Sequence, residues 1–412
     1  MFREQLIKNE KLDSTMCSCP LKGVNIVRVS TVPIFFVEQL RYQIEKLGQA
    51  GANVTVISSD GSELELLGGL PKIRCVTIEI ARPISLWLDL SALFRLFMFF
   101  RRENIQIAHS TTPKAGLIMA LAAFFAGVPI RLHTFTGQPW VKMCGIKRWL
   151  ARRSDRLIGY LNTRCYADGI GQRKFLLDQK LIDKDHLFVI GAGSLAGVDI
   201  QRFDPERFTL SDCTLTRQSL VIPKDVPVIL FIGRITVDKG VRDLLQAFKM
   251  VKATINDAHL LFVGKFDVDS GVSGGEISRN EIERLPDTHI IGHSKCPERY
   301  IAIADILCLP SYREGFGTAV IEAAAMGVPT IGTNIYGLSD AVVHGETGLL
   351  VPPYNAQELA KAISLLLSDR ALRDKMGKAA KLRLRTLFNA DVISKLVINE
   401  YVTLLKSKYV LR

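Results

Sequence analysis

The chain has 412 residues, 48% of them hydrophobic, which is enough for two or three domains with large buried cores. Its net charge of +12 is uneven, because residues 1–200 hold 26 Lys and Arg against 17 Asp and Glu, a surplus of 9. This basic half suits an anionic partner such as a membrane surface or a phosphorylated acceptor. The sequence contains no basic tail and no zinc or RNA-binding signature, so nucleic acid is the least favoured partner.

The cysteines and the apolar runs restrict the cellular setting. Eight cysteines are scattered without a C-x-x-C pair, which is typical of a reducing compartment in which cysteine serves as a small apolar residue. Residues 1–21 form a polar tail without a signal-peptide core. The longest apolar run, residues 115–128, has 14 residues, whereas a bilayer-spanning helix needs about 20. We therefore expect a protein that is not integral to a membrane but can lie on one.

Short apolar, β-branched runs alternate with helical patterns along the whole chain. The strand candidates are residues 24–30, 53–59, 74–80, 105–109, 130–135, 156–161, 187–190, 226–232, 259–263, 288–291, 306–309, 330–332 and 348–351. Near-continuous apolar strands that alternate with helices indicate parallel sheets covered on both faces. Because thirteen strands are too many for one compact doubly wound sheet, the pattern predicts an α/β protein with two Rossmann-like domains.

The boundary between the predicted domains falls in the polar, proline-containing stretch 198–208. We assign residues 22–200 to an N-terminal Rossmann-like domain and residues 201–387 to a C-terminal one. The amphipathic segment 388–412 is expected to be a helix that returns to the N-terminal domain. Ligands in such folds bind at the carboxyl ends of the strands, so both domains can border one cleft.

Two histidines and one aromatic, basic stretch stand out in the N-terminal half. His109 and His133 each end a predicted strand, where a histidine can hydrogen-bond a substrate hydroxyl or phosphate oxygen. The pattern alone favours histidines satisfied by the backbone, more strongly for His109. Residues 140–153 (WVKMCGIKRWLARR) fit either a membrane-interface helix or a basic surface helix with its tryptophans in the core. The glycine-rich stretch 191–197 lacks the spacing of a dinucleotide fingerprint and predicts a turn.

Two cations follow the first strand of the C-terminal half. Gly233 and Arg234 end the run VILFIGR, and Lys239 opens the next helix. An arginine fork and a lysine point charge five positions apart can converge on one diphosphate. The alternative is a solvated loop in which Asp238 forms a salt bridge. The pair Asp267 and Asp269 lies in a Gly/Ser-rich loop without a further ligand, which favours a solvated loop over a metal site.

The most informative segment is REGFGTAVIEAAAMGVPTI, directly after the strand candidate 306–309. Its Glu314 and Glu322 flank a turn and the start of an Ala-rich helix. The turn consists of Gly315, Phe316, Gly317 and Thr318. A glycine turn at a helix N-terminus leaves free backbone N–H groups that favour phosphate, and the carboxylates suit the hydroxyls of a sugar and a ribose. The arrangement predicts a nucleotide-sugar site, as opposed to an acidic helix start that only complements the helix dipole.

These segments resemble the retaining, two-domain glycosyltransferases of GT-B fold with an E-x7-E motif (family 4, glycosyl transferases group 1). REGFGTAVIEAAAMGVPTI looks like the motif, FIGRITVDKGVRDLLQAF like the phosphate-binding segment, and GLSDAVVHGETGLLVPP like the segment after the motif. Residues 107–140 and 189–203 are similar to a narrower bacterial branch that builds polyprenyl-diphosphate-linked oligosaccharides and surface polysaccharides. The resemblance covers about residues 22–405.

The resemblance implies a role for each matching residue. Arg234 and Lys239 would hold the donor diphosphate, Glu314 the donor-sugar hydroxyls and Glu322 the ribose diol. The turn 315–318 would present its backbone to the donor. His133 would lie near the donor sugar, and the segment 292–297, with Gly292 and Ser294, would border the base. One departure is the turn STVPI at residues 30–34, where many members have a glycine-rich loop.

The implied reaction moves a hexose or N-acetylhexosamine from a nucleotide diphosphate sugar, UDP-linked, to a hydroxyl of a lipid-linked saccharide. The anomeric configuration is retained, and positioning and electrostatics replace a metal or cofactor. The branch implies a cytoplasmic protein on the inner face of the cell membrane, bound through its basic N-terminal domain. Alternatives are a hydrolysing sugar-nucleotide epimerase of the same fold, against which the E-x7-E match speaks, and a non-catalytic nucleotide-sugar-binding subunit.

Overall fold

The computed structural model describes residues 19–81, 85–266 and 277–409. The chain divides into two compact units, which are treated separately below. Unit 1 comprises residues 1–197 and 390–412, and unit 2 comprises residues 198–389. The sequence analysis placed the first boundary after residue 200, three residues later than observed. It placed the second boundary after residue 387, two residues earlier than observed. Leu21, which we assigned to the polar tail, is fully buried in the core of unit 1.

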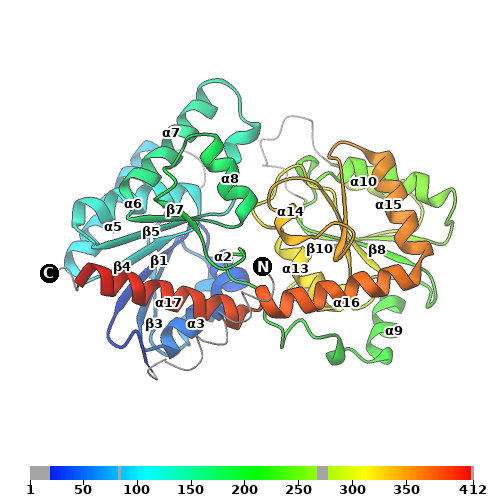
Figure 1. Ribbon diagram of the computed structural model, residues 1–412, viewed down its shortest axis with the longest axis horizontal. Coiled ribbons are helices and arrows are strands. Elements are labelled where there is room, and N and C mark those ends of the chain that lie inside the picture. Colours follow the sequence, from blue (N-terminus) through cyan, green and yellow to red (C-terminus); the bar gives the residue numbers. More distant parts are fainter. Residues whose placement is uncertain (1–18, 82–84, 267–276, 410–412) are drawn as a thin grey trace. The chain divides into compact units, whose positions relative to one another are not determined.

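Unit 1 contains a seven-stranded parallel sheet in the order β3-β2-β1-β4-β5-β6-β7 (Figure 1). Its strands are β1 (Asn25–Val29), β2 (Asn53–Ser58), β3 (Ile73–Thr77), β4 (Ile107–Ser110), β5 (Ile130–Phe135), β6 (Arg164–Ala167) and β7 (Leu187–Val189). Every neighbouring pair runs parallel. The strand order reverses direction between β1 and β4, which makes this pair the switch point of the sheet.

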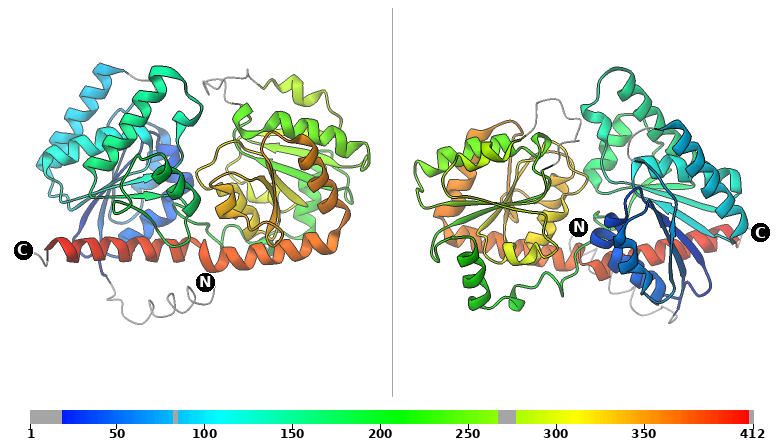
Figure 2. Two further views of the ribbon diagram at one scale, coloured as in Figure 1. Left: turned by 45° about the horizontal axis from the view of Figure 1, so that its top comes forward. Right: turned by 180° about the vertical axis from the view of Figure 1, so that it is seen from behind.

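Helices cover both faces of this sheet because its strands are apolar on both sides. The helical elements are α2 (Pro33–Phe35), η1 (Phe36–Leu40), α3 (Arg41–Gln49), η2 (Ser62–Leu64), α4 (Glu65–Gly68), α5 (Leu86–Arg102), α6 (Pro113–Ala126), η3 (Pro139–Lys142), α7 (Gly145–Leu161), α8 (Ile170–Asp178) and α17 (Ala390–Tyr409). One core cluster joins the sheet to α3 and α17, and a second joins it to α5 and α6. The C-terminal helix α17 packs beside α3 within unit 1 (Figures 1 and 2).

Unit 2 repeats the plan with six parallel strands in the order β10-β9-β8-β11-β12-β13. The strands are β8 (Val228–Ile232), β9 (His259–Val263), β10 (Thr288–Gly292), β11 (Ile306–Leu309), β12 (Thr330–Thr333) and β13 (Gly348–Val351). The helical elements are η4 (Pro205–Arg207), α9 (Leu210–Ser219), η5 (Val237–Lys239), α10 (Val241–Lys252), α11 (Arg279–Glu283), α12 (Glu298–Ile301), α13 (Thr318–Ala325), α14 (Leu338–Ala341), α15 (Ala356–Ser368) and α16 (Arg370–Leu387). Helix α10 packs on α15, and α13 packs on α16. The switch point of unit 2 lies between β8 and β11.

The predicted fold class is confirmed, and twelve of the thirteen predicted strands overlap an observed one. The exception is the candidate 156–161 (RLIGYL), which is the last part of helix α7. Ile158 and Leu161 face the core there while Leu157 and Tyr160 are exposed, so the run is amphipathic with helical spacing. The missing strand is β6, only three residues further on, whose polar first residue Arg164 obscured it. Short apolar runs of this kind fit a helix or a strand equally well.

Candidate functional site

The predicted site residues of unit 2 gather at the carboxyl ends of β8 and β11. These two strands are hydrogen-bonded neighbours in the sheet. The loop that follows β8 carries Arg234 and Lys239, and the loop that follows β11 carries Glu314 and leads into helix α13. In a doubly wound sheet, the switch point is where two loops diverge and leave room for a ligand.

The two loops are in close contact because Gly240 lies against the second one. Gly240 has a φ of 70° and sits between η5 and α10. A Cβ atom there would lie 2.0 Å from the carbonyl oxygen of Pro310, so no other residue fits without separating the loops. The backbone N–H of Tyr312 also donates to the carbonyl oxygen of Asp238 over 2.9 Å. Backbone contacts alone therefore bring the two strand ends together.

Lys239 and Glu314 form an ion pair inside this junction. The Lys239 Nζ lies 2.5 Å from Glu314 Oε1, and the side chains are 15% and 11% exposed. The Ser311 hydroxyl donates to the same carboxylate oxygen over 2.7 Å. The sequence predicted that both charged groups would bind the donor, at its diphosphate and its sugar respectively. In this structure they neutralise each other, so a ligand that engages Lys239 competes with Glu314 for its ammonium group.

Arg234 is more accessible than Lys239. Its side chain is 44% exposed, and its Nη2 lies 3.8 Å from the carboxylate of Asp238, which is 1% exposed. Thr236 donates a hydrogen bond to Asp238, and Arg313 lies 3.4 Å from it. Burial raises the pKa of Asp238, but the Thr236 hydrogen bond and the charges of Arg234, Lys239 and Arg313 outweigh it and lower the pKa overall. Asp238 thus stays ionised and holds the cations of this edge in place.

The turn before α13 has the geometry that a phosphate site needs. Gly317 is the N-cap residue of α13 with a φ of 81°, and no side chain caps the helix. The first backbone N–H groups of α13, from Thr318 onward, therefore have no side-chain cap at the end where the helix dipole is positive. Phe316 is 3% exposed and points into the core, so only its backbone can face a ligand. Glu322 lies in the second turn of the helix and is partly buried.

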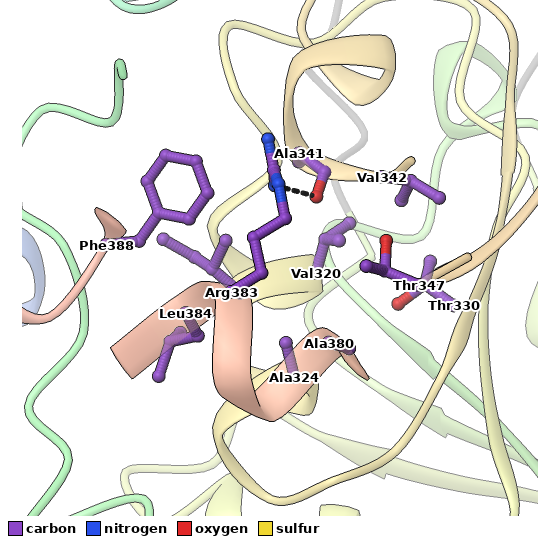
Figure 3. A pocket seen from close by; sticks show the side chains of 11 residues that line it. Val320, Ala324, Thr330, Ala341, Val342, Thr347, Ala380, Arg383, Leu384 and Phe388 are labelled. Atoms are coloured by element: carbon purple, nitrogen blue, oxygen red, sulfur yellow. Dashed lines mark hydrogen bonds between the residues drawn. The ribbon is translucent and has the colours of Figure 1, made fainter. Parts of the chain in front are cut away.

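An apolar pocket beneath α13 fixes the position of this turn (Figure 3). The ring of Phe388 packs edge-on against the ring of Phe316, with centroids 5.1 Å apart. The guanidinium of Arg383 lies 4.8 Å from the Phe388 ring centroid and donates to the carbonyl oxygens of Asp340 and Ala341, each over 2.8 Å. Burial lowers the pKa of Arg383. The pocket is too small and too closely packed to be a ligand site, and it acts as the support for the turn.

Gly292 and Ser294, which we expected near the base, lie at the end of β10 and two residues beyond it, at the same edge of the sheet. Gly292 ends the strand with a φ of 78°, and the Ser294 hydroxyl accepts from the backbone N–H of Cys296 over 3.1 Å. Arg202 binds this loop and was missed by the sequence analysis. It donates to the Lys295 carbonyl oxygen over 2.6 Å and pairs with Glu298 at 2.9 Å. Its partners lie more than ninety positions away, so no local pattern could have revealed the contact.

His133 has a different setting from the one that the sequence suggested. It is the fourth of six residues in β5, so the expectation that it ends its strand is wrong. The ring is fully buried, Nδ1 lies 2.9 Å from the Ser110 hydroxyl, and Nε2 has no hydrogen-bond partner within the described residues. Burial lowers its pKa to about 3. These are the surroundings of a neutral core histidine.

His109 belongs to a buried polar network that ties α17 to the sheet. Its Nδ1 lies 2.6 Å from the Tyr401 hydroxyl and its Nε2 lies 2.8 Å from the Thr134 hydroxyl. The fully buried Arg28 donates to Tyr401 over 3.2 Å and to Gln43 over 2.7 Å. Burial, and to a lesser extent the charge of Arg28, lowers the pKa of His109 far below its ordinary value. The network is structural. His109 is a core histidine, as the pattern favoured, but its partners are the side chains of Tyr401 and Thr134 and not the backbone.

The two tryptophans of residues 140–153 have opposite environments. Trp140 is 1% exposed, and its indole N–H donates to Asp155 over 2.6 Å, whereas Trp149 is 51% exposed. Burial raises the pKa of Asp155 to about 6, although the hydrogen bond from Trp140 lowers it. The expectation that the tryptophans lie in the core is therefore correct for Trp140 and wrong for Trp149, and the membrane-interface interpretation stays a prediction.

The remaining motifs concern a glycine-rich turn, metal ligands and membrane spans. The stretch 191–197 forms turns with positive φ angles at Gly191, Gly193, Ser194 and Gly197, as predicted. Asp267 and Asp269 lie outside the described residues. Among residues 19–81, 85–266 and 277–409, no three His, Cys, Asp or Glu side chains are grouped to hold a metal ion. Within the same ranges, no helix combines the length and apolarity needed to cross a bilayer.

The chain thus has two Rossmann-like units of the GT-B kind, with cations, a carboxylate and a helix N-terminus at the switch point of the second. Solved structures share this fold. A glycosyltransferase from Rickettsia africae has a TM-score of 0.75 and 23% identity, covering 93% of this chain and 99% of that one. The Anabaena protein HepE in complex with UDP-glucose has a TM-score of 0.74 and 18% identity, covering 92% and 99%.

Sequence comparisons agree with this class. The profile described as "Glycosyl transferases group 1" matches residues 213–383. The capsular polysaccharide biosynthesis glycosyltransferase CapM of Staphylococcus aureus is 31% identical over 367 residues, which cover 89% of this chain and 94% of CapM. The chain belongs to the glycosyl transferases group 1 family and is a glycosyltransferase.

Proposed function

We propose that this glycosyltransferase moves a hexose or N-acetylhexosamine from a UDP-sugar to a hydroxyl of a lipid-linked saccharide during surface polysaccharide assembly. The observation that carries the proposal is the convergence of Arg234, Lys239, Glu314 and the α13 N-terminus at one switch point. The relative CapM acts in capsular polysaccharide biosynthesis by its name, and the fold neighbour HepE was solved with UDP-glucose. Both support the choice of substrate class.

In the proposed reaction, the bond between the anomeric carbon and the diphosphate oxygen breaks, and a bond to the acceptor oxygen forms on the same face. The departing phosphate takes the acceptor proton. Arg234 and the N–H groups at the start of α13 stabilise the charge that develops on the diphosphate. Lys239 exchanges Glu314 for the phosphate, which frees the carboxylate to accept hydrogen bonds from the sugar hydroxyls. Glu322 binds the ribose diol, and Gly292 and Ser294 border the base.

The proposal includes attachment to an anionic membrane through unit 1. Helix α5 packs on α6, and α6 packs on α7. These helices carry large exposed apolar side chains, among them Trp87 (84% exposed), Phe94 (63%) and Trp149 (51%). Exposed basic residues accompany them on α5 and α7: Arg95, Arg101, Arg102, Lys147, Arg148, Arg153 and Arg156. Apolar anchors with a basic surround fit an interface of anionic lipids. Cosedimentation with phosphatidylglycerol vesicles, but not with neutral ones, is expected, with W87A/W149A reducing it.

The decisive experiment measures donor binding and transfer with the full chain. A thermal-shift panel of UDP, GDP, ADP and CMP should show stabilisation by UDP, by about 2.7 kcal/mol at a hundred times its Kd. Labelled UDP-sugars with lipid-linked saccharide acceptors should then give a glycosylated product, equally in the presence of EDTA. Release of free UDP and sugar without a transferred product would favour the epimerase-like alternative, and loss of transfer with EDTA would refute the metal-free mechanism.

A further inference from the structure

Arg202 joins two parts of unit 2 that are remote in sequence. Its Nε and Nη2 groups bind both carboxylate oxygens of Glu298, over 3.2 Å and 2.9 Å, and Nη2 also donates to the Lys295 carbonyl oxygen. A bidentate arginine–carboxylate pair has a defined direction as well as strength. Glu298 is 8% exposed, which protects the pair from solvent. The clamp therefore fixes the loop that follows β10.

The segment that carries Arg202 is itself rigid. Asp199 accepts hydrogen bonds from the backbone N–H groups of Gln201 and Arg202, and its carbonyl oxygen accepts from Phe203. Phe203 is 5% exposed, and its ring centroid lies 5.1 Å from the guanidinium carbon of Arg202. Turn, aromatic support and carboxylate together hold the guanidinium plane in one orientation.

One part of the guanidinium remains for a ligand. The Nη1 group makes no hydrogen bond to the part of the chain that the structure describes, and the side chain is 38% exposed. Burial lowers the pKa of Arg202. The pairing with Glu298 and, to a lesser extent, the negative charge of Glu322 on α13 outweigh burial and raise the pKa overall. Through its hydrogen bond to the Lys295 carbonyl oxygen, Arg202 lies against the loop that we assign to the base.

We propose that Arg202 is a specificity-determining residue that selects a base with a carbonyl oxygen at C4, uracil rather than cytosine. This inference rests on the proposed donor site. An arginine N–H can only donate, so it favours a carbonyl oxygen and is repelled by an amino group at the same position. At C4, uracil carries a carbonyl and cytosine an amino group, and at N3 uracil donates whereas cytosine accepts. UDP and CDP therefore compare these two hydrogen-bonding patterns on an otherwise identical nucleotide.

The test is a titration of the full chain with UDP and with CDP, followed by thermal shift or calorimetry. The wild-type chain should bind UDP at least tenfold more tightly than CDP, since a hydrogen bond to a charged donor contributes about 1.5–3 kcal/mol. R202M should lose most of this preference, chiefly through weaker UDP binding. R202K, which keeps the charge without the fork, should fall between the two. The matched control R299K changes an exposed arginine on α12, next to Glu298, and should keep the wild-type ratio.

The outcomes separate this inference from the function on which it rests. If the wild-type chain binds neither nucleotide, the donor site itself is refuted. If it binds both equally, or if R202M and R202K keep the wild-type ratio, Arg202 does not select the base although the donor site stands. A drop in melting temperature without nucleotide reports the loss of the clamp. R202K decides the matter if R202M fails to fold, because it can still pair with Glu298.

Discussion

The two switch points have the same topology but opposite chemistry. In unit 1, the charged or titratable groups on the two switch strands β1 and β4 are Arg28 and His109, and both are buried. His133 on the next strand, β5, is buried as well, and burial lowers the pKa of both histidines. The loops at this edge carry hydroxyl groups, and Thr31 hydrogen-bonds Thr112 over 2.8 Å. In unit 2, Arg234, Lys239 and Glu314 crowd the corresponding edge. One topology thus serves a neutral, hydroxyl-lined edge and a charged one suited to a diphosphate.

The sharpest test of this contrast removes the ion pair of unit 2. K239M should lower kcat/KM for transfer by about a thousandfold, because it removes a cation from the diphosphate in a shielded site. It should also reduce the free energy of unfolding by about 3 kcal/mol, since Glu314 is left buried without its partner. The double variant K239M/E314Q should regain most of that stability without regaining activity. Denaturant unfolding and initial rates measure the two effects, and recovery of activity in the double variant would refute the proposed role of Lys239.

Arg234 should separate activity from stability more cleanly. R234M is expected to lower kcat/KM by about a hundredfold, as for the loss of one electrostatic contact to a developing charge. Its free energy of unfolding should hardly change, because a side chain that is 44% exposed contributes little through its pair with Asp238. The control R242K changes a half-exposed arginine on α10 that pairs with Glu281. Equal activity of R234M and R242K would contradict the charged-edge interpretation.

His133 tests the neutral edge of unit 1. Its pKa of about 3 in the folded chain lies below the ordinary value of 6.5, so the unfolded chain binds a proton first. The contribution of His133 to the free energy of unfolding is fully present above pH 6.5. It declines as the pH falls from 6.5 towards 3, by up to about 1.4 kcal/mol per pH unit. H133Q should flatten the decline between pH 6 and 4 and change transfer only slightly. A large loss of transfer with an unchanged pH profile of stability would instead support the donor-sugar role implied by the family resemblance.

The smallest effect is expected at the aromatic support of the turn. F388L should cost about 1 kcal/mol of stability, because it removes the edge-to-face contact with Phe316. It should raise the KM for the donor several-fold and leave kcat nearly unchanged, since the turn is loosened but retains its backbone groups. An unchanged KM would show that the turn is positioned without Phe388.

The sequence predicted the charged edge better than the neutral one for a physical reason. In unit 2, strand, turn and helix follow one another within residues 306–325, so local patterns sufficed to locate Glu314 and the turn. The Lys239–Glu314 pair spans 75 positions, and only the sheet order brings its members together. His133 was misplaced because two further strand residues follow it, and burial cannot be read from a single position. Residues 156–161 were predicted to be a strand but belong to helix α7, and the strand is β6, because a short apolar run fits a helix or a strand equally well.

Unit 1 is interrupted in sequence, since unit 2 is inserted between residue 197 and residue 390. During synthesis, unit 2 emerges as one continuous stretch and can fold while the ribosome is still at work. The sheet of unit 1 must wait for α17, because Tyr401 supplies a hydroxyl to both Arg28 and His109. Until α17 has been synthesised, Arg28 lacks the Tyr401 hydroxyl as a hydrogen-bond acceptor. A nascent chain arrested before residue 401 should therefore contain a folded unit 2 and an incomplete unit 1, and be a target for chaperones and proteases.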